Sequence, residues 1–284
     1  MGLRIQNNVE AFNAHRQLNT TAAKASKSME KLSSGYRVNR AADDAAGLAI
    51  SEKMRGQIGG LAQAQRNAQD AISMVQTGEG ALGEVHAMLQ RVRDLRVQFE
   101  NGTLSADDKA AVLSEVKQLS TEMAEIQKNT EFNDIRLLQG DIDGAGPGGA
   151  SIDFQVGANT GETLTVTTVD LNGANGLGTI DGLSAATGTA ELSALTLDAI
   201  DVAINNVAKI RSDFGAVQNR LEHRLTNLAT YQENLVASES RIRDVDMAAE
   251  MVTFTKLGIL QQAGTSMLAQ ANQSPQGVLS LLQG

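Results

Sequence analysis

Residues 200–242 carry the pattern that decides the expected fold, and they read IDVAINNVAKIRSDFGAVQNRLEHRLTNLATYQENLVASESRI. Within this stretch, seven apolar residues recur at intervals of seven: Ile200, Val207, Phe214, Leu221, Leu228, Leu235 and Ile242. Apolar residues at this period form one stripe along a helix, as in helices that pack side by side. The stretch therefore predicts a long helix over about residues 194–245.

The same period occurs earlier in the chain. One stripe consists of Leu61, Ala68, Val75, Leu82 and Leu89, and a second stripe, offset by three, consists of Ala64, Ala71, Gly78, Val85, Val92 and Phe99. Asp43 and Asp44 precede this region with carboxylates suited to a helix start, and Asn101-Gly102 follows it with a turn signal. These features predict a helix over about residues 44–99, roughly 80 Å long at 1.5 Å per residue.

A third helix and a β-hairpin are expected in the middle of the chain. Ser105 supplies an N-cap, after which apolar residues follow at helical spacing: Val112, Val116, Leu119, Met123 and Ile126. Residues 140–190 are rich in Gly, Thr, Asn and Ala. Within them, 152–156 and 163–167 alternate between apolar and polar residues on either side of the turn-rich segment 157–161, which predicts a hairpin.

Both ends of the chain carry apolar stripes of their own. An isolated helix is only marginally stable in water, so these stripes need partners to bury them. We expect the two ends to pair with each other and also to bind other copies. The candidate self-association residues are Ile5, Val9, Phe12, Leu18, Met29, Leu32, Met251, Phe254, Leu257, Leu260, Met267, Leu268, Leu279 and Leu282.

Composition excludes several classes of function. The net charge of −9 argues against a nucleic-acid binder, and the aromatic content of 3% argues against a conventional small-ligand pocket. There is no Cys, and no stretch approaches the 18 uninterrupted apolar residues of a membrane span. Residues 1–8 lack the apolar core of a secretory signal, so sequence physics alone favours the cytosol.

The residues that could carry chemistry have simpler explanations. His15, His86 and His223 stand singly, without the paired spacing of metal ligands. The Gly-x-Gly-x-x-Gly run at 78–83 lies inside the heptad pattern, where it predicts close helix packing rather than a dinucleotide site. Asp43 and Asp44 are adjacent, so they point in different directions on a helix and fit capping better than catalysis. We therefore assign no catalytic, cofactor-binding or metal-binding residues.

Long motifs at both ends resemble those of bacterial flagellins. The N-terminal motifs are LSSGYRVNRAADDAAGLAI at 32–50, RNAQDAIS at 66–73 and TGEGAL at 77–82. The C-terminal motifs are FGAVQNRLE at 214–222, ASESRIRDVDMA at 237–248 and ILQQAGTSMLAQANQ at 259–273. The resemblance covers nearly the whole chain except about residues 140–195.

The resemblance implies a mainly α fold, with long antiparallel helices packed as an elongated coiled-coil-like bundle and a small β-hairpin insert. Residues 1–42 and 243–284 would form the coiled coil of the filament's inner tube. Residues 43–242 would form the rod domain, with the short variable insert at about 140–195. The implied function is that of a minimal flagellin without large outer domains, a non-enzymatic subunit that self-assembles into the filament used for swimming.

The resemblance also implies location and partners. Flagellins are exported unfolded by the flagellar type III apparatus with the help of a chaperone, so the expected location is extracellular, without a cleaved signal peptide. Expected partners are other copies, the filament cap, the hook-junction proteins and host flagellin receptors, with neither nucleic acid nor membrane. A Toll-like receptor would contact Gln90, Arg91, Leu95 and Glu115. A plant receptor would read residues 30–51, including Asp43, Asp44 and Gly47.

Three alternatives remain beside this reading. The first is a hook–filament junction protein, which shares the terminal pattern. The second is an enzyme with a metallopeptidase insert, but the insert here contains no His. The third is a membrane-active helix, which would need a polar face rich in Lys and Arg.

Overall fold

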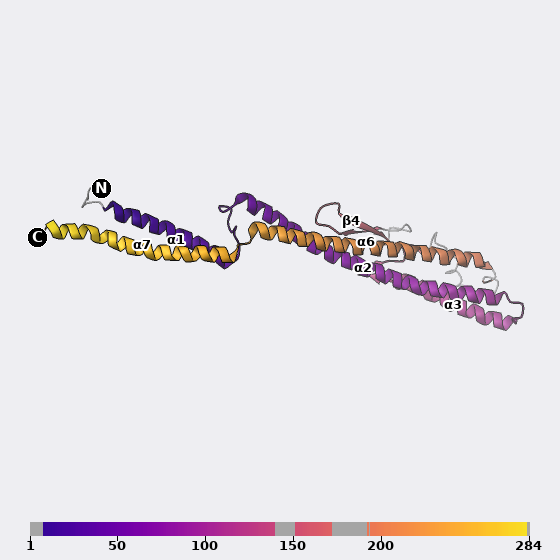
Figure 1. Ribbon diagram of the computed structural model, residues 1–284. Helices are drawn as coiled ribbons and strands as arrows, with labels where there is room; N and C mark the ends of the chain where they lie inside the picture. Colours follow the sequence, from indigo (N-terminus) through magenta and orange to yellow (C-terminus); the bar gives the residue numbers. More distant parts are fainter. Residues whose placement is uncertain (1–7, 140–150, 172–191, 193, 283–284) are drawn as a thin grey trace. The chain divides into compact units, whose positions relative to one another are not determined.

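The computed structural model describes residues 8–139, 151–171, 192 and 194–282, with side chains described up to Gln273. Figure 1 shows a mainly α chain, which confirms the predicted fold class. The helices named within the described residues are α1 (Val9–Ser34), α2 (Ala45–Phe99), α3 (Ala106–Asn129), α6 (Leu197–Arg243) and α7 (Met247–Leu282).

The chain divides into two compact units. Unit 1 contains residues 1–57 and 233–284, and unit 2 contains residues 58–232. Both boundaries fall inside helices, because α2 begins in unit 1 and ends in unit 2, and α6 does the reverse. The expected division into residues 1–42 with 243–284 and residues 43–242 describes roles in an assembled polymer, and it stays a proposal.

Helix α2 begins where the sequence predicts. The Asp44 carboxylate accepts a hydrogen bond from the Gly47 backbone N–H at 2.8 Å, and the Asp44 carbonyl accepts one from Leu48 at 3.0 Å. This N-cap satisfies an amide that would otherwise lack a partner in the first turn. Every residue of the two predicted α2 stripes is buried, because both stripes face the core of unit 2.

Helix α3 begins with a capping box. The Asp108 N–H donates to Ser105 Oγ at 3.2 Å, and the Ser105 N–H donates to Asp108 Oδ2 at 3.0 Å. Hydrogen bonds from the Ser105 side chain and backbone hold the pKa of Asp108 below its ordinary value. The box fixes the start of α3 after the turn that follows α2.

Helix α6 runs antiparallel to α2 within unit 2. Arg93 in the last part of α2 pairs with Asp201 in the first turns of α6 at 2.6 Å. Gln65 nearer the start of α2 bonds to Gln232 far along α6 at 2.8 Å. The apolar stripes of the two helices meet in one core with α3 and the strands. The α6 stripe is buried as far as Leu228.

The predicted hairpin is confirmed as β3 (Ser151–Gln155) and β4 (Thr163–Thr167), which pair antiparallel with Ser151 opposite Thr167. Alternation along β4 turns Leu164 and Val166 into the core and leaves the threonines between them exposed. The turn packs on α2, where a Cβ added to Gly60 would lie 3.1 Å from the Ala158 Cβ. The insert is thus part of unit 2.

A second hairpin joins β1 (Glu131–Phe132) to β2 (Ile135–Arg136). Sequence analysis does not predict it. The two residues between the strands, Asn133 and Asp134, have φ of 51° and 64°, as a two-residue hairpin turn of type I′ requires. The pair Asn133-Asp134 between Phe132 and Ile135 was the available signal, but strands of two residues show no alternation.

Candidate self-association surface

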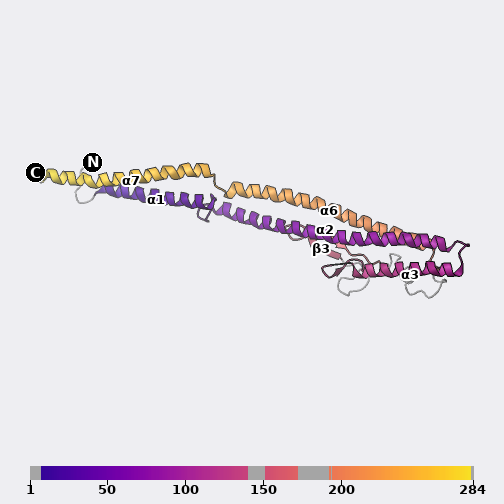
Figure 2. The same ribbon diagram turned by 90° about the horizontal axis from the view of Figure 1, so that it is seen from below.

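Helices α1 and α7 form an antiparallel pair in unit 1, and both ribbon views show them side by side (Figures 1 and 2). Near one end of the pair, Asn8 Nδ2 donates to the Ala271 carbonyl at 2.7 Å. Near the other end, Ser28 Oγ donates to Glu250 Oε1 at 2.5 Å. Because polar contacts at both ends agree, they fix one register of the two helices.

The segment that precedes α2 and the segment that precedes α7 are joined by backbone hydrogen bonds. The Arg37 N–H donates to the Arg243 carbonyl at 2.6 Å, and the Val245 N–H donates to the Gly35 carbonyl at 3.0 Å. The Arg243 guanidinium lies 4.6 Å from the Tyr36 ring centroid, close enough for a cation–π contact. It also pairs with Glu52 at 2.9 Å. This junction places the start of α7 beside the end of α1.

The predicted self-association residues separate into two groups. The half-buried group consists of Leu18, Leu32, Phe254, Leu257 and Leu268. The exposed group consists of Val9, Phe12, Met29, Met251, Leu260 and Met267. Ile5 and the side chains of Leu279 and Leu282 lie outside the described residues. A helix with apolar residues on more than one side can pair inside its own chain and still present an apolar face.

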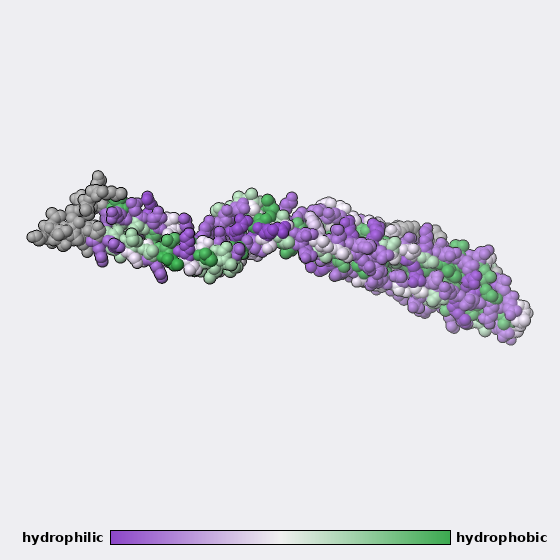
Figure 3. Space-filling model, viewed as in Figure 1, coloured by the Kyte–Doolittle hydropathy of each residue, from purple (hydrophilic) through white to green (hydrophobic). Residues whose placement is uncertain are grey.

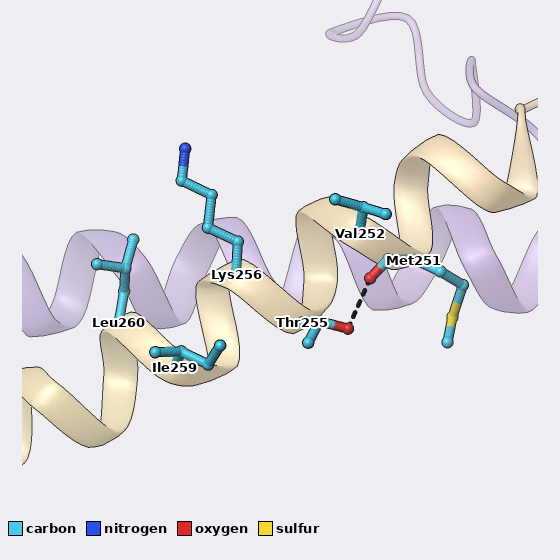
Figure 4. Close-up of a pocket in the computed structure, with 6 residues that line it drawn as sticks. All are labelled: Met251, Val252, Thr255, Lys256, Ile259 and Leu260. Carbon is cyan, nitrogen blue, oxygen red and sulfur yellow. Dashed lines mark hydrogen bonds between the residues drawn. The ribbon is translucent and has the colours of Figure 1, made fainter.

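Sequence analysis missed two members of the exposed group on α7. Val252 is 71% exposed and Ile259 is 63% exposed. Their spacing of seven along one helix was the signal that could have found them. With Met251, Thr255, Lys256 and Leu260 they line a shallow groove, in which the labelled side chains stand free of the neighbouring ribbon (Figure 4).

We call the exposed apolar residues of α1 and α7 the assembly surface. It consists of Val9, Phe12, Met29, Met247, Met251, Val252, Ile259, Leu260 and Met267. Figure 3 shows hydrophobic residues at the surface over these helices. A second groove, between α1 and α7, is lined in part by Leu18, Leu260 and Met267.

Unit 1 buries very little apolar surface by itself. Among its described residues, Val38 is the single hydrophobic side chain that is buried, whereas unit 2 contains a continuous core. Burial of one large apolar side chain contributes about 1.5–3 kcal/mol, so the nine exposed ones of the assembly surface represent a large unused contribution. Exposed apolar patches of this kind mark interaction sites. The arrangement can therefore bind further helices.

The residues of the expected Toll-like receptor contact lie on unit 2. Gln90 is exposed, and Arg91 donates from Nε and from its terminal nitrogen to Glu115 Oε1 across α2 and α3, at 2.8 and 2.6 Å. Leu95 requires a correction, because it is 2% exposed. It lies three residues after Val92 and four before Phe99, on the face of α2 that enters the core.

The residues of the expected plant epitope hold the entry to α2. Asp43 pairs with Lys27 at 2.6 Å, and hydrogen bonds from Lys27 and from the Arg40 backbone lower the pKa of Asp43. Asp44 is the N-cap of α2. Gly47 is buried, and a Cβ there would lie 2.4 Å from Asp44 Oδ2. All three positions are engaged in the fold.

Within the part of the chain that the structure describes, no three His, Asp or Glu side chains gather as a metal site would require. The described helices also include none that is long and apolar enough to cross a membrane.

Two family models match the chain. The bacterial flagellin N-terminal helical region matches residues 5–143, and the bacterial flagellin C-terminal helical region matches residues 197–282. A flagellin of Halalkalibacterium halodurans is 51% identical over 282 residues, which cover 98% of this chain and 99% of the relative. The flagellar filament 33 kDa core protein of Treponema phagedenis is 45% identical, with 98% and 99% covered.

Solved structures add a likeness in fold. The crystal structure of Bacillus cereus FlgL matches with a TM-score of 0.54 at 17% identity, covering 66% of this chain and 99% of that chain.

Proposed function

The chain belongs to the bacterial flagellin family, and from that premise we propose that α1 and α7 carry the surface through which its copies polymerise. The protein is a structural subunit of the flagellar filament, an extracellular appendage used for motility, and it is not an enzyme. It is of the short type, without a large outer domain.

One observation carries the proposal. The terminal helices pair with each other and still leave the assembly surface open, with Phe12 and Val252 each 71% exposed. In a polymer, neighbouring copies would bury these side chains, and each buried side chain would lower the free energy of the assembled state by about 1.5–3 kcal/mol.

The test is a single charge placed on the assembly surface. Ile259→Asp puts a carboxylate in the α7 groove, where burial without a partner is costly. We expect the critical concentration for filament formation to rise at least 100-fold in a sedimentation assay checked by electron microscopy. The control Thr160→Asp adds the same charge at the exposed hairpin turn of unit 2. Normal assembly of the Ile259→Asp protein would refute the proposed surface.

The finer domain roles belong to the same proposal. Residues 1–42 and 243–284 would line the inner tube of the filament, and residues 43–242 would form the rod domain around it. The intramolecular α1–α7 pair supports the first assignment, because both segments meet in unit 1. The assembled chain would adjoin the filament cap at one end of the filament and the hook-junction proteins at the other.

Export would precede assembly. We propose that the chain leaves the cell through the flagellar type III apparatus, without a cleaved signal peptide, and that a chaperone holds the C-terminal segment until then. The exposed apolar side chains of α7 support this idea, since they would otherwise associate inside the cell.

Host receptors would read two further regions. A Toll-like receptor would contact Gln90, Arg91 and Glu115 on the surface of unit 2, and the supporting observation is the ordered Arg91–Glu115 pair. A plant receptor would read residues 30–51. Because Gly47 is buried and Asp44 is the N-cap of α2, that recognition would require the segment to leave the fold.

A further inference from the structure

Four exposed methionines lie on the terminal helices α1 and α7. Met29, Met247, Met251 and Met267 are each about half exposed or more, up to 61% for Met267. The chain has nine methionines and no cysteine, so thioethers are its readily oxidised sulfur groups. Met74 and Met123, by contrast, are buried in the core of unit 2.

The exposed methionines coincide with the surface that assembly must bury. Met251 lines the α7 groove with Val252 and Ile259, and its thioether extends away from the helix (Figure 4). Met267 lines the second groove, between α1 and α7. Met29 extends the same surface on α1, and Met247 lies one helical turn before Met251.

Oxidation would change the character of this surface. A thioether sulfur attacks one oxygen of hydrogen peroxide, the O–O bond breaks, an S–O bond forms, and the second oxygen leaves as water after proton transfer. Sulfur loses two electrons and the peroxide gains them. The product is a sulfoxide, which is polar and accepts hydrogen bonds, so it disrupts apolar contacts that methionine supports.

We propose that Met29, Met247, Met251 and Met267 form a peroxide-sensitive modification site that prevents the free subunit from polymerising. The inference rests on the proposed assembly surface. Peroxide acts on the free subunit because the thioethers are open to solvent there. Burial between copies shields the same thioethers in the filament. Unit 2 keeps its fold because Met74 and Met123 are enclosed and Met88 is half-buried against the same core. A methionine sulfoxide reductase reverses the block.

The experiment compares oxidation of the free subunit and of assembled filaments. Both are treated with hydrogen peroxide, and the sulfoxide at each methionine is followed by peptide mass spectrometry. In the free subunit, the four exposed methionines oxidise at least tenfold faster than Met74 and Met123. In filaments, their oxidation slows by about tenfold or more. The oxidised subunit shows a critical concentration raised about tenfold or more, and reductase treatment restores it.

Two variants separate the site from general damage. A protein with Met29, Met247, Met251 and Met267 all changed to Leu keeps an apolar surface of similar volume. Its critical concentration, whatever its value before treatment, is the same before and after peroxide. The matched variant M74L/M123L assembles before peroxide and fails after it, as the unchanged protein does.

Three results would overturn the inference. They are equal oxidation rates for exposed and buried methionines, unchanged assembly of the fully oxidised subunit, and equal inhibition of the quadruple Leu variant. Normal assembly of the Ile259→Asp protein, by contrast, would refute the proposed surface itself, so the two failures are distinguishable.

Discussion

Gly78 lies at a point where α2 and α6 approach too closely for a side chain. A Cβ at Gly78 would lie 2.8 Å from Phe214 Cε2, whereas nothing lies within 4 Å of one at Gly80. Both glycines are interior residues of α2, so Gly→Ala adds the same helix propensity at each. We expect G80A to stabilise unit 2 by about 0.5–1 kcal/mol, and G78A to be less stable than G80A by about 1–3 kcal/mol.

Urea unfolding followed by circular dichroism measures this difference. Equal urea midpoints for the two alanine variants would show that the Phe214 ring moves aside without loss of folding stability, which would contradict this prediction. Of the glycine-rich run at 78–83, Gly78 serves close helix packing as predicted, whereas a Cβ at Gly80 or Gly83 would meet nothing within 4 Å.

Asp43 should make the entry to α2 sensitive to acid. Its pair with Lys27, followed by the hydrogen bond from the Arg40 backbone, lowers its pKa in the folded state. A lowered folded-state pKa stabilises the fold above the unfolded-state pKa of about 3.9, and this stabilisation is lost as pH falls below about 4. We expect D43N to melt below the unchanged protein at pH 7, and the difference to shrink as pH falls through the lowered folded-state pKa. A difference that stays constant or grows as the pH is lowered from 7 would contradict this linkage.

At the scale of elements, the seven-residue period of apolar residues predicted the limits and the buried residues of a helix where one face of that helix is buried. Every residue of the two α2 stripes is buried, and α2 begins at Ala45 and ends at Phe99, within one residue of the predicted limits. The helix predicted over about residues 194–245 is α6, which runs from Leu197 to Arg243. The first strand of the predicted hairpin is displaced by one residue, and the second has the predicted limits. Heptad stripes locate helices well because a core selects one face.

The period of apolar residues did not predict which residues of the terminal helices pair inside the chain. Apolar residues lie on more than one side of α1 and α7, so the sequence does not reveal which side forms the intramolecular pair. The structure divides the predicted self-association residues into the half-buried group and the exposed group, and it adds Val252 and Ile259 to the exposed residues. Leu95 shows the opposite error, since motif resemblance placed a core residue on the surface.

The α2–α3 pair carries the receptor prediction. R91E reverses the charge that pairs with Glu115, and the pair is exposed, so its loss costs about 0–1 kcal/mol and the fold survives. We expect the concentration for half-maximal Toll-like receptor signalling to rise about tenfold or more in reporter cells. R93E is the matched control, because Arg93 also makes one exposed ion pair between helices, with Asp201. Unchanged signalling by R91E would remove Arg91 from the contact.

At the scale of the molecule, the two units are stabilised in different ways. Unit 2 has its own core, whereas unit 1 depends on the meeting of segments from both ends of the chain. Deletion of residues 278–284 shortens α7 and should weaken or abolish polymerisation, because a long helix is needed to complete the surface. Unit 2 should keep its melting temperature. Sedimentation and circular dichroism measure both effects, and normal assembly of the truncated chain would refute the role of the tail.

The hydrogen bond from Ser28 to Glu250 joins residues that are 222 positions apart, and the one from Asn8 joins residues 263 apart. A chain that ends before Glu250 can make neither bond, and one that ends before Ala271 cannot make the second. Under the proposed function, a copy cut at such a point would keep the core of unit 2 but would lack the paired helices through which it joins its neighbours.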